Sequence, residues 1–123
     1  DLGIDLDNIT FKDVIKIFGT QNQKGGVIFF DALPVAEQDK DLVVLDVMNV
    51  HYKPYYEKEE APGDWHNPSP IFFLAVEKGT KFRFALASKN RELVEKSKEL
   101  LKEALENLGI GAKTSAGYGY FKV

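Results

Sequence analysis

The sequence predicts an α+β fold, in which a mostly antiparallel sheet carries its helices on one face. Three observations predict it. Strand-like segments outnumber helical ones, two of these strands flank a Lys-Gly turn as a hairpin would, and one long amphipathic helix stands near the C-terminus. The expected order is helix, two strands, long loop, hairpin, helix and strand. With 123 residues the chain suits one compact domain with one core, and we expect that domain to span residues 1–123.

The composition is that of an ordinary globular protein, with 44% hydrophobic and 28% charged residues. No apolar run approaches the roughly 20 residues that a membrane-spanning helix needs. The N-terminus has no resemblance to a secretory signal, and without cysteine no disulfide can form. These features predict a cytoplasmic protein that has no membrane partner.

The formal net charge of −3 argues against a protein that binds nucleic acid tightly on its own. The charges are unevenly distributed, however. Between Glu77 and Glu92 every charge is positive, and after Glu106 only lysines follow. The cations of these two stretches are Lys78, Lys81, Arg83, Lys89, Arg91, Lys113 and Lys122. We therefore expect an anionic partner to contact the C-terminal half.

Residues 8–19, NITFKDVIKIFG, predict a short helix that Asn8 or Thr10 can cap and that Gly19 ends. Its apolar residues recur at helical spacing. They are Phe11, Val14, Ile15 and Phe18. A turn, QNQKGG, follows at residues 21–26.

The next segments predict strands. Residues 26–34, GVIFFDALP, are apolar on both faces, as in an interior strand, and Pro34 closes the segment. A linker leads to a second strand-like run at residues 42–48, LVVLDVM. Residues 71–87, IFFLAVEKGTKFRFALA, predict a hairpin. Its second arm alternates large apolar residues with Lys81 and Arg83, which favours a buried face and a cationic face.

Residues 52–70 form a long proline-rich segment with no periodicity, and loops of this length are usually functional or disordered. Tyr52, Tyr55, Tyr56 and Trp65 argue against simple disorder. These aromatic side chains either stack on RNA bases or, as we favour, anchor the loop to protein.

Residues 90–109, NRELVEKSKELLKEALENLG, predict the longest helix. Glu–Lys pairs such as Glu92–Lys96 lie on its outer face, and Gly109 occupies the place of a left-handed C-cap. The apolar face comprises Leu93, Val94, Ser97, Leu100, Leu101, Ala104, Leu105 and Leu108. The alternation in YGYFKV, residues 118–123, predicts a last strand.

Four glycines occur in the eleven residues 109–119, GIGAKTSAGYG. A nucleotide P-loop needs Gly-Lys-Ser/Thr before a helix, and here Lys113 follows Ala112 and a strand is expected next. The dinucleotide fingerprint fails because its third glycine would fall on Thr114. Both nucleotide interpretations are therefore excluded.

Two interpretations of this segment remain. In the first, Gly109 caps the helix while Gly117 and Gly119 form a strand bulge. In the second, the glycines let the loop approach an RNA backbone, with a cation and two hydroxyls at its tip. Those tip residues are Lys113, Thr114 and Ser115.

A helix followed by Gly-hydrophobic-Gly, five residues and Gly-hydrophobic-Gly resembles the C-terminal signature of the RAMP superfamily of CRISPR proteins. The signature glycines match Gly109, Gly111, Gly117 and Gly119. The blocks VIFFDALP, LDVMNVHYKPYY and DWHNPSPIFFLAVEKGTKFRF narrow the resemblance to the sixth-subunit family of type III-B effector complexes.

This resemblance implies a ferredoxin-like, RRM-related domain in an RNA-guided antiviral complex. The implied partners are guide RNA, target RNA and other RAMP subunits, and the implied role is non-catalytic. From the residues themselves we expect no cofactor and no metal. The expected RNA-binding residues are Gly109, Gly111, Lys113, Thr114, Ser115, Gly117, Gly119, Lys81 and Arg83. Compared with the family pattern, the N-terminal part is missing. We therefore expect an incomplete domain whose exposed sheet edge can pair with another copy.

Two alternatives stay open. His51 or His66 could serve as the acid or base of an endoribonuclease, although their spacing does not suit a metal site. The glycine loop could also pack against a neighbouring protein and contact no RNA.

Overall fold

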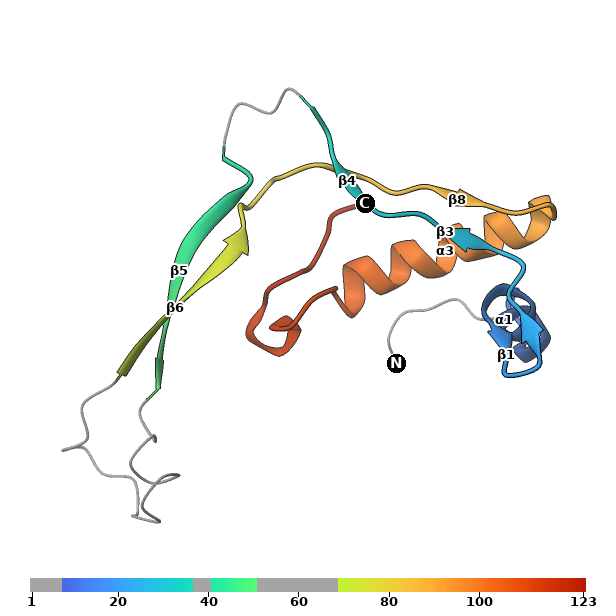
Figure 1. Cartoon of the computed structure of the whole chain (residues 1–123), viewed down its shortest axis with the longest axis horizontal. Coiled ribbons are helices and arrows are strands. Elements are labelled where there is room, and N and C mark those ends of the chain that lie inside the picture. The colour runs from blue at the N-terminus through green and yellow to red at the C-terminus, as the bar shows by residue number, and fades with distance from the viewer. Residues whose placement is uncertain (1–7, 37–40, 51–68) are drawn as a thin grey trace, which may run out of the picture. The chain divides into compact units, whose positions relative to one another are not determined.

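The computed structural model describes residues 8–36, 41–50 and 69–123 (Figure 1). They form two compact units, one from Asp1–Ala32 and Phe84–Val123 and the other from Leu33–Arg83. Every strand pair within the described residues is antiparallel, and two α-helices accompany them, which confirms the α+β class. The strands form four two-stranded pairs. In the part of the chain that is described, no helix is long and apolar enough to cross a membrane.

Helix α1 (Phe11–Phe18) begins with a capping box. The Thr10 hydroxyl accepts a hydrogen bond from the Asp13 N–H at 3.3 Å, and the Asp13 carboxylate accepts one from the Thr10 N–H at 2.9 Å. Both bonds satisfy N–H groups that a helix start leaves unpaired. At the other end, Gly19 has φ 82° and ψ −169°, a backbone conformation that glycine adopts readily and other residues rarely adopt.

The apolar residues that defined α1 in the sequence do not form its buried face. Asp13 and Ile17 are buried, whereas Phe11 is 78% exposed and Phe18 is 62% exposed. Phe18 stacks on Phe29, with ring centroids 5.6 Å apart. The helix is therefore turned so that the Asp13 side faces the other helix of this unit.

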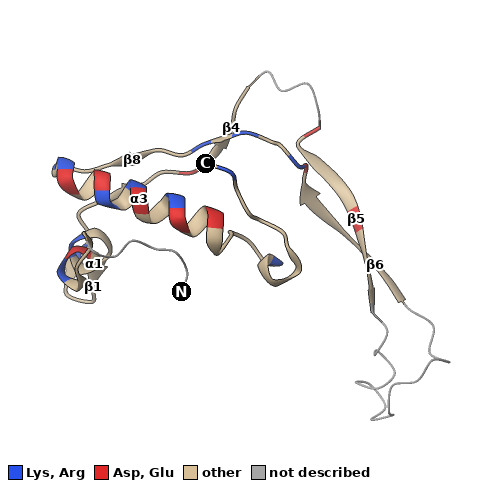
Figure 2. Cartoon of the chain, turned by 180° about the vertical axis from the view of Figure 1, so that it is seen from behind, with Lys and Arg blue, Asp and Glu red and all other residues tan. Residues whose placement is uncertain are grey.

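Helix α3 (Arg91–Asn107) matches its predicted span, and Asn90 caps it by accepting from the N–H groups of Glu92 and Leu93. Its apolar face builds the core, where Leu93 packs with Ile17 and Val27. Leu105 and Ser97 are also buried. Lysine and glutamate alternate along the outer face (Figure 2), as the sequence predicts.

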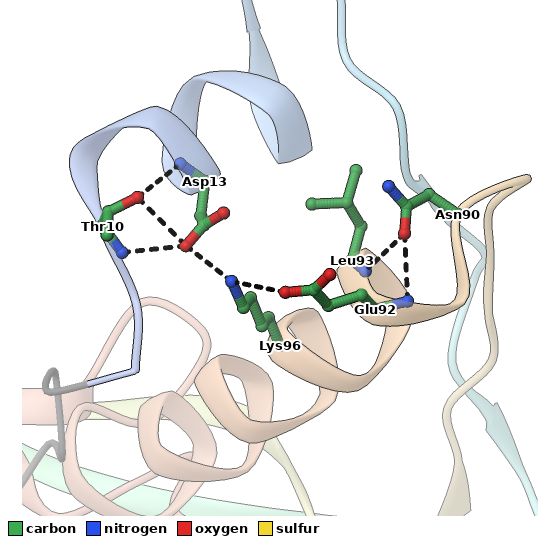
Figure 3. A network of polar contacts seen from close by, with 6 residues as sticks. All are labelled: Thr10, Asp13, Asn90, Glu92, Leu93 and Lys96. Atoms are coloured by element: carbon green, nitrogen blue, oxygen red, sulfur yellow. Dashed lines mark hydrogen bonds and ion pairs between the residues drawn. The ribbon is translucent and has the colours of Figure 1, made fainter.

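An ion pair ties the two helices together (Figure 3). The Lys96 Nζ lies 2.9 Å from the Asp13 Oδ2 and 3.1 Å from a carboxylate oxygen of Glu92. The N–H of Thr10 and then Lys96 lower the pKa of Asp13 from 3.8 to about 2. The same bond to Asp13, followed by the bond to Glu92, raises the pKa of Lys96.

The predicted interior strand at residues 26–34 is wrong in two respects. It is split into β3 (Ile28–Phe29) and β4 (Leu33–Pro34), which pair with different partners. Apart from Val27, which is buried, its large apolar side chains are also exposed, at 52% for Ile28 and 64% for Leu33. Before it, β1 (Gly19–Thr20) and β2 (Gln23–Lys24) form a small hairpin, so the turn predicted over residues 21–26 is confined to Gln21 and Asn22 between these strands.

Strand β3 pairs with β8 (Leu86–Ala87), which contacts α3. In the second unit, β4 pairs with β7 (Phe82–Arg83), and β5 (Val43–Val50) pairs with β6 (Ser69–Val76) over their whole lengths. The predicted hairpin at residues 71–87 is therefore wrong in its pairing. The turn is present, since the Thr80 N–H donates to the Glu77 carbonyl, but the two arms pair with earlier strands.

Candidate nucleic-acid interface

The glycine segment begins where α3 ends. The Ala104 carbonyl accepts hydrogen bonds from the N–H groups of Leu108 and Gly109, both at 2.9 Å. Gly109 has φ 73°, so the chain leaves the helix through a left-handed residue. The prediction that Gly109 serves as the left-handed cap is confirmed.

The loop is closed at its neck by two packed glycines. The Ile110 N–H donates to the Gly119 carbonyl at 2.9 Å. A Cβ atom on Gly119 would collide with the Ile110 carbonyl oxygen, and one on Gly109 would lie 3.0 Å from the Thr114 γ-methyl. A side chain at Gly119 would push the two ends of the loop apart, so this position requires glycine for space as well as for conformation, whereas at Gly109 the contacts are tight and the positive φ is the main requirement.

A short 3-10 turn, η1 (Thr114–Ala116), shapes the distal part of the loop. The Lys113 carbonyl accepts from the N–H groups of Ala116 and Tyr118, both at 3.1 Å, and the Gly117 N–H donates to Thr114 at 3.1 Å. Gly117, at φ 94° and ψ 8°, ends the turn in the left-handed region. These bonds give the loop a defined conformation.

The outer side of the loop is open. Gly111 and Gly117 are exposed, at φ 115° and 94°, and a Cβ atom on either one would meet nothing within 4 Å. Among the described residues, no group accepts a hydrogen bond from the N–H of Gly111 or Ala112. Two backbone donors therefore stand on a surface that another chain can approach closely. The sequence prediction overlooked Ala112, because every residue except proline has a backbone N–H and the residue type does not show which N–H groups are open.

The three predicted tip residues differ in exposure. Ser115 is exposed, whereas Lys113 and Thr114 are half-buried, and the γ-methyl of Thr114 packs toward Gly109. Thr114 thus fills the inside of the loop as well as carrying a hydroxyl. In the chain, Lys113 lies between the open donors and the turn η1, for which it is the N-cap residue.

The predicted last strand at residues 118–123 is wrong, and with it the interpretation of Gly117 and Gly119 as a strand bulge. The Phe121 N–H donates to the Leu105 carbonyl at 3.0 Å, and the Val123 N–H donates to the Glu106 carboxylate. The Phe121 ring packs edge-on against Phe84, 5.6 Å away. The tail therefore binds the C-terminal end of α3, where carbonyl groups lack helical partners.

A sequence model described as the RAMP superfamily matches residues 2–122. The chain belongs to the RAMP superfamily. The four glycines that carry the superfamily signature all adopt positive φ in this RAMP domain, two at the neck of the loop and two on its outer side.

Two curated relatives are both described as CRISPR system Cmr subunit Cmr6. The protein from Pyrococcus furiosus is 53% identical over 113 residues, which are 87% of this chain and 33% of the relative. The protein from Saccharolobus solfataricus is 30% identical over 117 residues, which are 95% of this chain and 39% of the relative. The chain thus spans between a third and two fifths of the length of these curated relatives.

Two solved structures resemble it. The crystal structure of Cmr6 from Pyrococcus furiosus matches with a TM-score of 0.63 and 50% identity, over 91% of this chain and 51% of that chain. A chain in the cryo-EM structure of the Type III-B Cmr-beta bound to cognate target RNA matches with a TM-score of 0.71 and 26% identity, over 95% of this chain and 39% of that chain.

Lys81 and Arg83 lie in the unit formed by Leu33–Arg83, whereas the glycine loop lies in the other unit. Both side chains are exposed, and they alternate with the half-buried Phe82 and Phe84 as predicted. Arg83 stands opposite Leu33 in the β4–β7 pair. Their contact with RNA stays a prediction.

His51 and His66, and most of the proline-rich segment 52–70, lie outside the described residues. Within the described residues, no group of three or more histidine, cysteine, aspartate or glutamate side chains is placed to hold a metal ion. The endoribonuclease hypothesis therefore stays open.

Proposed function

We propose that this RAMP domain is a non-catalytic, RNA-binding part of a cytoplasmic type III-B CRISPR effector complex in antiviral defence. Its loop at residues 109–119 contacts the backbone of the guide RNA. Its partners are the guide RNA, the target RNA paired with it and the neighbouring RAMP subunits. The similarity to two Cmr6 proteins, and to a chain of a complex bound to target RNA, supports this assignment.

The single observation that carries the proposal is that the four glycines have two different structural roles. Gly109 and Gly119 close the neck, which fixes the loop on the end of α3. Gly111 and Gly117 keep the outer side free of Cβ atoms. This arrangement holds an open backbone surface in place, and that surface would otherwise cost conformational entropy to order.

The chemistry of that surface suits a phosphodiester chain. Backbone N–H groups donate to phosphate oxygens, and an adjacent lysine adds a positive charge. The Gly111 and Ala112 donors stand beside Lys113, and Ser115 adds an exposed hydroxyl. None of these groups reads a base edge, so we expect binding that depends little on sequence. Lys81 and Arg83 are two further exposed cations that we propose contact RNA phosphates.

The experiment measures the affinity of labelled single-stranded RNA by fluorescence anisotropy for the parent chain and for Gly111→Ala. The new methyl group enters open space, so it interferes chiefly with a molecule that approaches the loop. We expect the affinity to fall about tenfold or more, which corresponds to about 1.4 kcal/mol. Unchanged affinity would contradict contact at the loop.

The matched control is Asn90→Ala, which removes the N-cap of α3 far along the chain from the loop. Its cost, about 1 kcal/mol, is similar to the strain expected from alanine at a left-handed position. If both variants lose RNA affinity equally, the loss reflects stability and does not report on the loop. Incubation with RNA tests the non-catalytic part. Cleavage that disappears in His51→Ala or His66→Ala would overturn it.

A further inference from the structure

The tail that follows the glycine loop has a fixed backbone (red in Figure 1). The Phe121 N–H donates to the Leu105 carbonyl at 3.0 Å, and the Val123 N–H donates to the Glu106 carboxylate at 3.2 Å. The Phe121 ring packs edge-on against Phe84. These contacts hold the tail on the C-terminal end of α3, so the side chains that it presents to solvent start from defined positions.

Two side chains of the tail take no part in this packing. Tyr120 is 47% exposed, and Lys122 is also exposed, on the other side of the half-buried Phe121. Among the described residues, neither the Tyr120 hydroxyl nor the Lys122 ammonium has a hydrogen-bond or ion-pair partner. An aromatic ring gains free energy when it leaves water. The tail therefore offers an aromatic surface and a positive charge that its own fold does not use.

Both side chains lie close to the open donors of the loop. Tyr120 directly follows Gly119, whose carbonyl accepts from the Ile110 N–H at 2.9 Å, and Ile110 directly precedes Gly111. Tyr120 and Gly111 are thus each one residue away from the same hydrogen bond. With about 3.8 Å between consecutive Cα atoms, the Cα atoms of these two residues lie at most about 15 Å apart. A few nucleotides of one RNA strand cover that span.

The pairing of a ring with a lysine indicates which kind of partner fits. Proteins that bind single strands combine cations that follow the backbone with aromatic rings on which bases stack. In a duplex the bases are stacked on one another, so a ring has access only to an unpaired base. A protein partner fits less well, because lysine is depleted in protein–protein interfaces.

We propose that Tyr120 stacks on an unpaired base of the RNA whose backbone the glycine loop holds, and that Lys122 neutralises a neighbouring phosphate. This inference rests on the proposed function and adds the form of the ligand, which is a single-stranded segment at this point. Neither residue belongs to the RNA-binding set predicted from the sequence. Stacking accepts every base, so the binding still depends little on RNA sequence.

Fluorescence anisotropy of a labelled single-stranded RNA, in a salt series, tests the inference with three variants. Tyr120→Leu keeps an apolar side chain but removes the ring, and it should lower the affinity about fivefold or more. Tyr120→Phe keeps the ring and should recover most of that loss. Neither variant changes a charge, so both should keep the parent's salt slope. Lys122→Ala should lower the slope by about 0.7.

Two controls separate stacking from a general loss of structure. The first is an RNA of the same length whose bases have been removed, to which Tyr120→Leu should bind as tightly as the parent does. The second is Phe11→Ala on α1, where the side chain is 78% exposed, which should leave the affinity for ordinary RNA unchanged. An equal loss of affinity for both RNAs in Tyr120→Leu would overturn stacking.

The same titrations distinguish failure of this inference from failure of the proposed function. If Tyr120→Leu binds ordinary RNA as the parent does, while Lys113→Ala lowers the affinity and the salt slope, stacking is wrong and the contact at the loop stands. If the parent binds no RNA at any salt concentration, both proposals are wrong.

Discussion

The Ile110 N–H donates to the Gly119 carbonyl at 2.9 Å, and this bond joins the two ends of the glycine loop. The four signature glycines differ in what they do around it. At Gly119 there is no room for a side chain, whereas at Gly111 a side chain would enter open space. Both have positive φ, so conformational strain alone does not distinguish them.

Gly119→Ala should therefore destabilise the chain more than Gly111→Ala. At Gly111 only the left-handed conformation is disfavoured, which costs about 1–2 kcal/mol. At Gly119 the same strain is joined by a collision with the Ile110 carbonyl, so we expect about 3 kcal/mol or more. Urea unfolding of both variants measures the difference. Equal losses would show that the neck can open without penalty.

The lowered pKa of the Asp13 carboxylate should make the stability of the fold sensitive to acid. Its pKa in the folded chain, about 2, lies below the ordinary value of 3.8. A lowered folded pKa means that the stabilisation is fully present above about pH 4 and is lost as the pH falls toward about 2. Asp13→Asn should lower the Tm at neutral pH and flatten its decline across that window.

The control for Asp13→Asn is Glu99→Gln, which removes one carboxylate from the outer face of α3, where Glu99 lies 3.5 Å from Lys102. Exposed ion pairs contribute little, so this variant should keep the parent's dependence of Tm on pH. If Asp13→Asn also keeps it, the carboxylate does not hold α1 against α3 in the way that the structure indicates.

Replacing the buried Ser97 by alanine should stabilise the chain. Its side chain is 1% exposed, and among the described residues its hydroxyl has no hydrogen-bond partner. Removing an unsatisfied buried hydroxyl, and gaining the helix propensity of alanine, should raise the free energy of unfolding by about 1 kcal/mol. Ser97→Ala and the exposed Ser115→Ala can be compared by thermal unfolding, with no change expected for the second. A clear loss of stability in Ser97→Ala would reveal a bound water or another partner.

The sequence predicted most accurately the features that local chemistry determines. Helix α3 begins at an asparagine cap and ends at a left-handed glycine. Each of these residues acts on the adjacent end of the helix and needs no partner far along the chain. The long apolar run of β5 also predicted its strand. At the loop, the sequence predicted the left-handed residue Gly109 that ends α3.

The sequence predicted poorly what depends on partners far along the chain. The arms flanking Lys78–Gly79 form no hairpin, because β6 pairs with all eight residues of β5. The tail forms no strand, because the Phe121 N–H donates to the Leu105 carbonyl at the end of α3 and the Phe121 ring packs against Phe84. On α1, a search for apolar periodicity overlooked Asp13, whose burial depends on Lys96.

The central claim is that the glycine loop holds a phosphate backbone, and RNA affinity measured across a salt series tests it most directly. Each phosphate contact by a cation contributes about 0.7 to the slope of log affinity against log salt for single strands. We predict that Lys113→Ala lowers both the affinity and this slope by about one such contact. Lys102→Ala, on the outer face of α3, should match the parent. Coincident titrations for the parent and Lys113→Ala would contradict the claim.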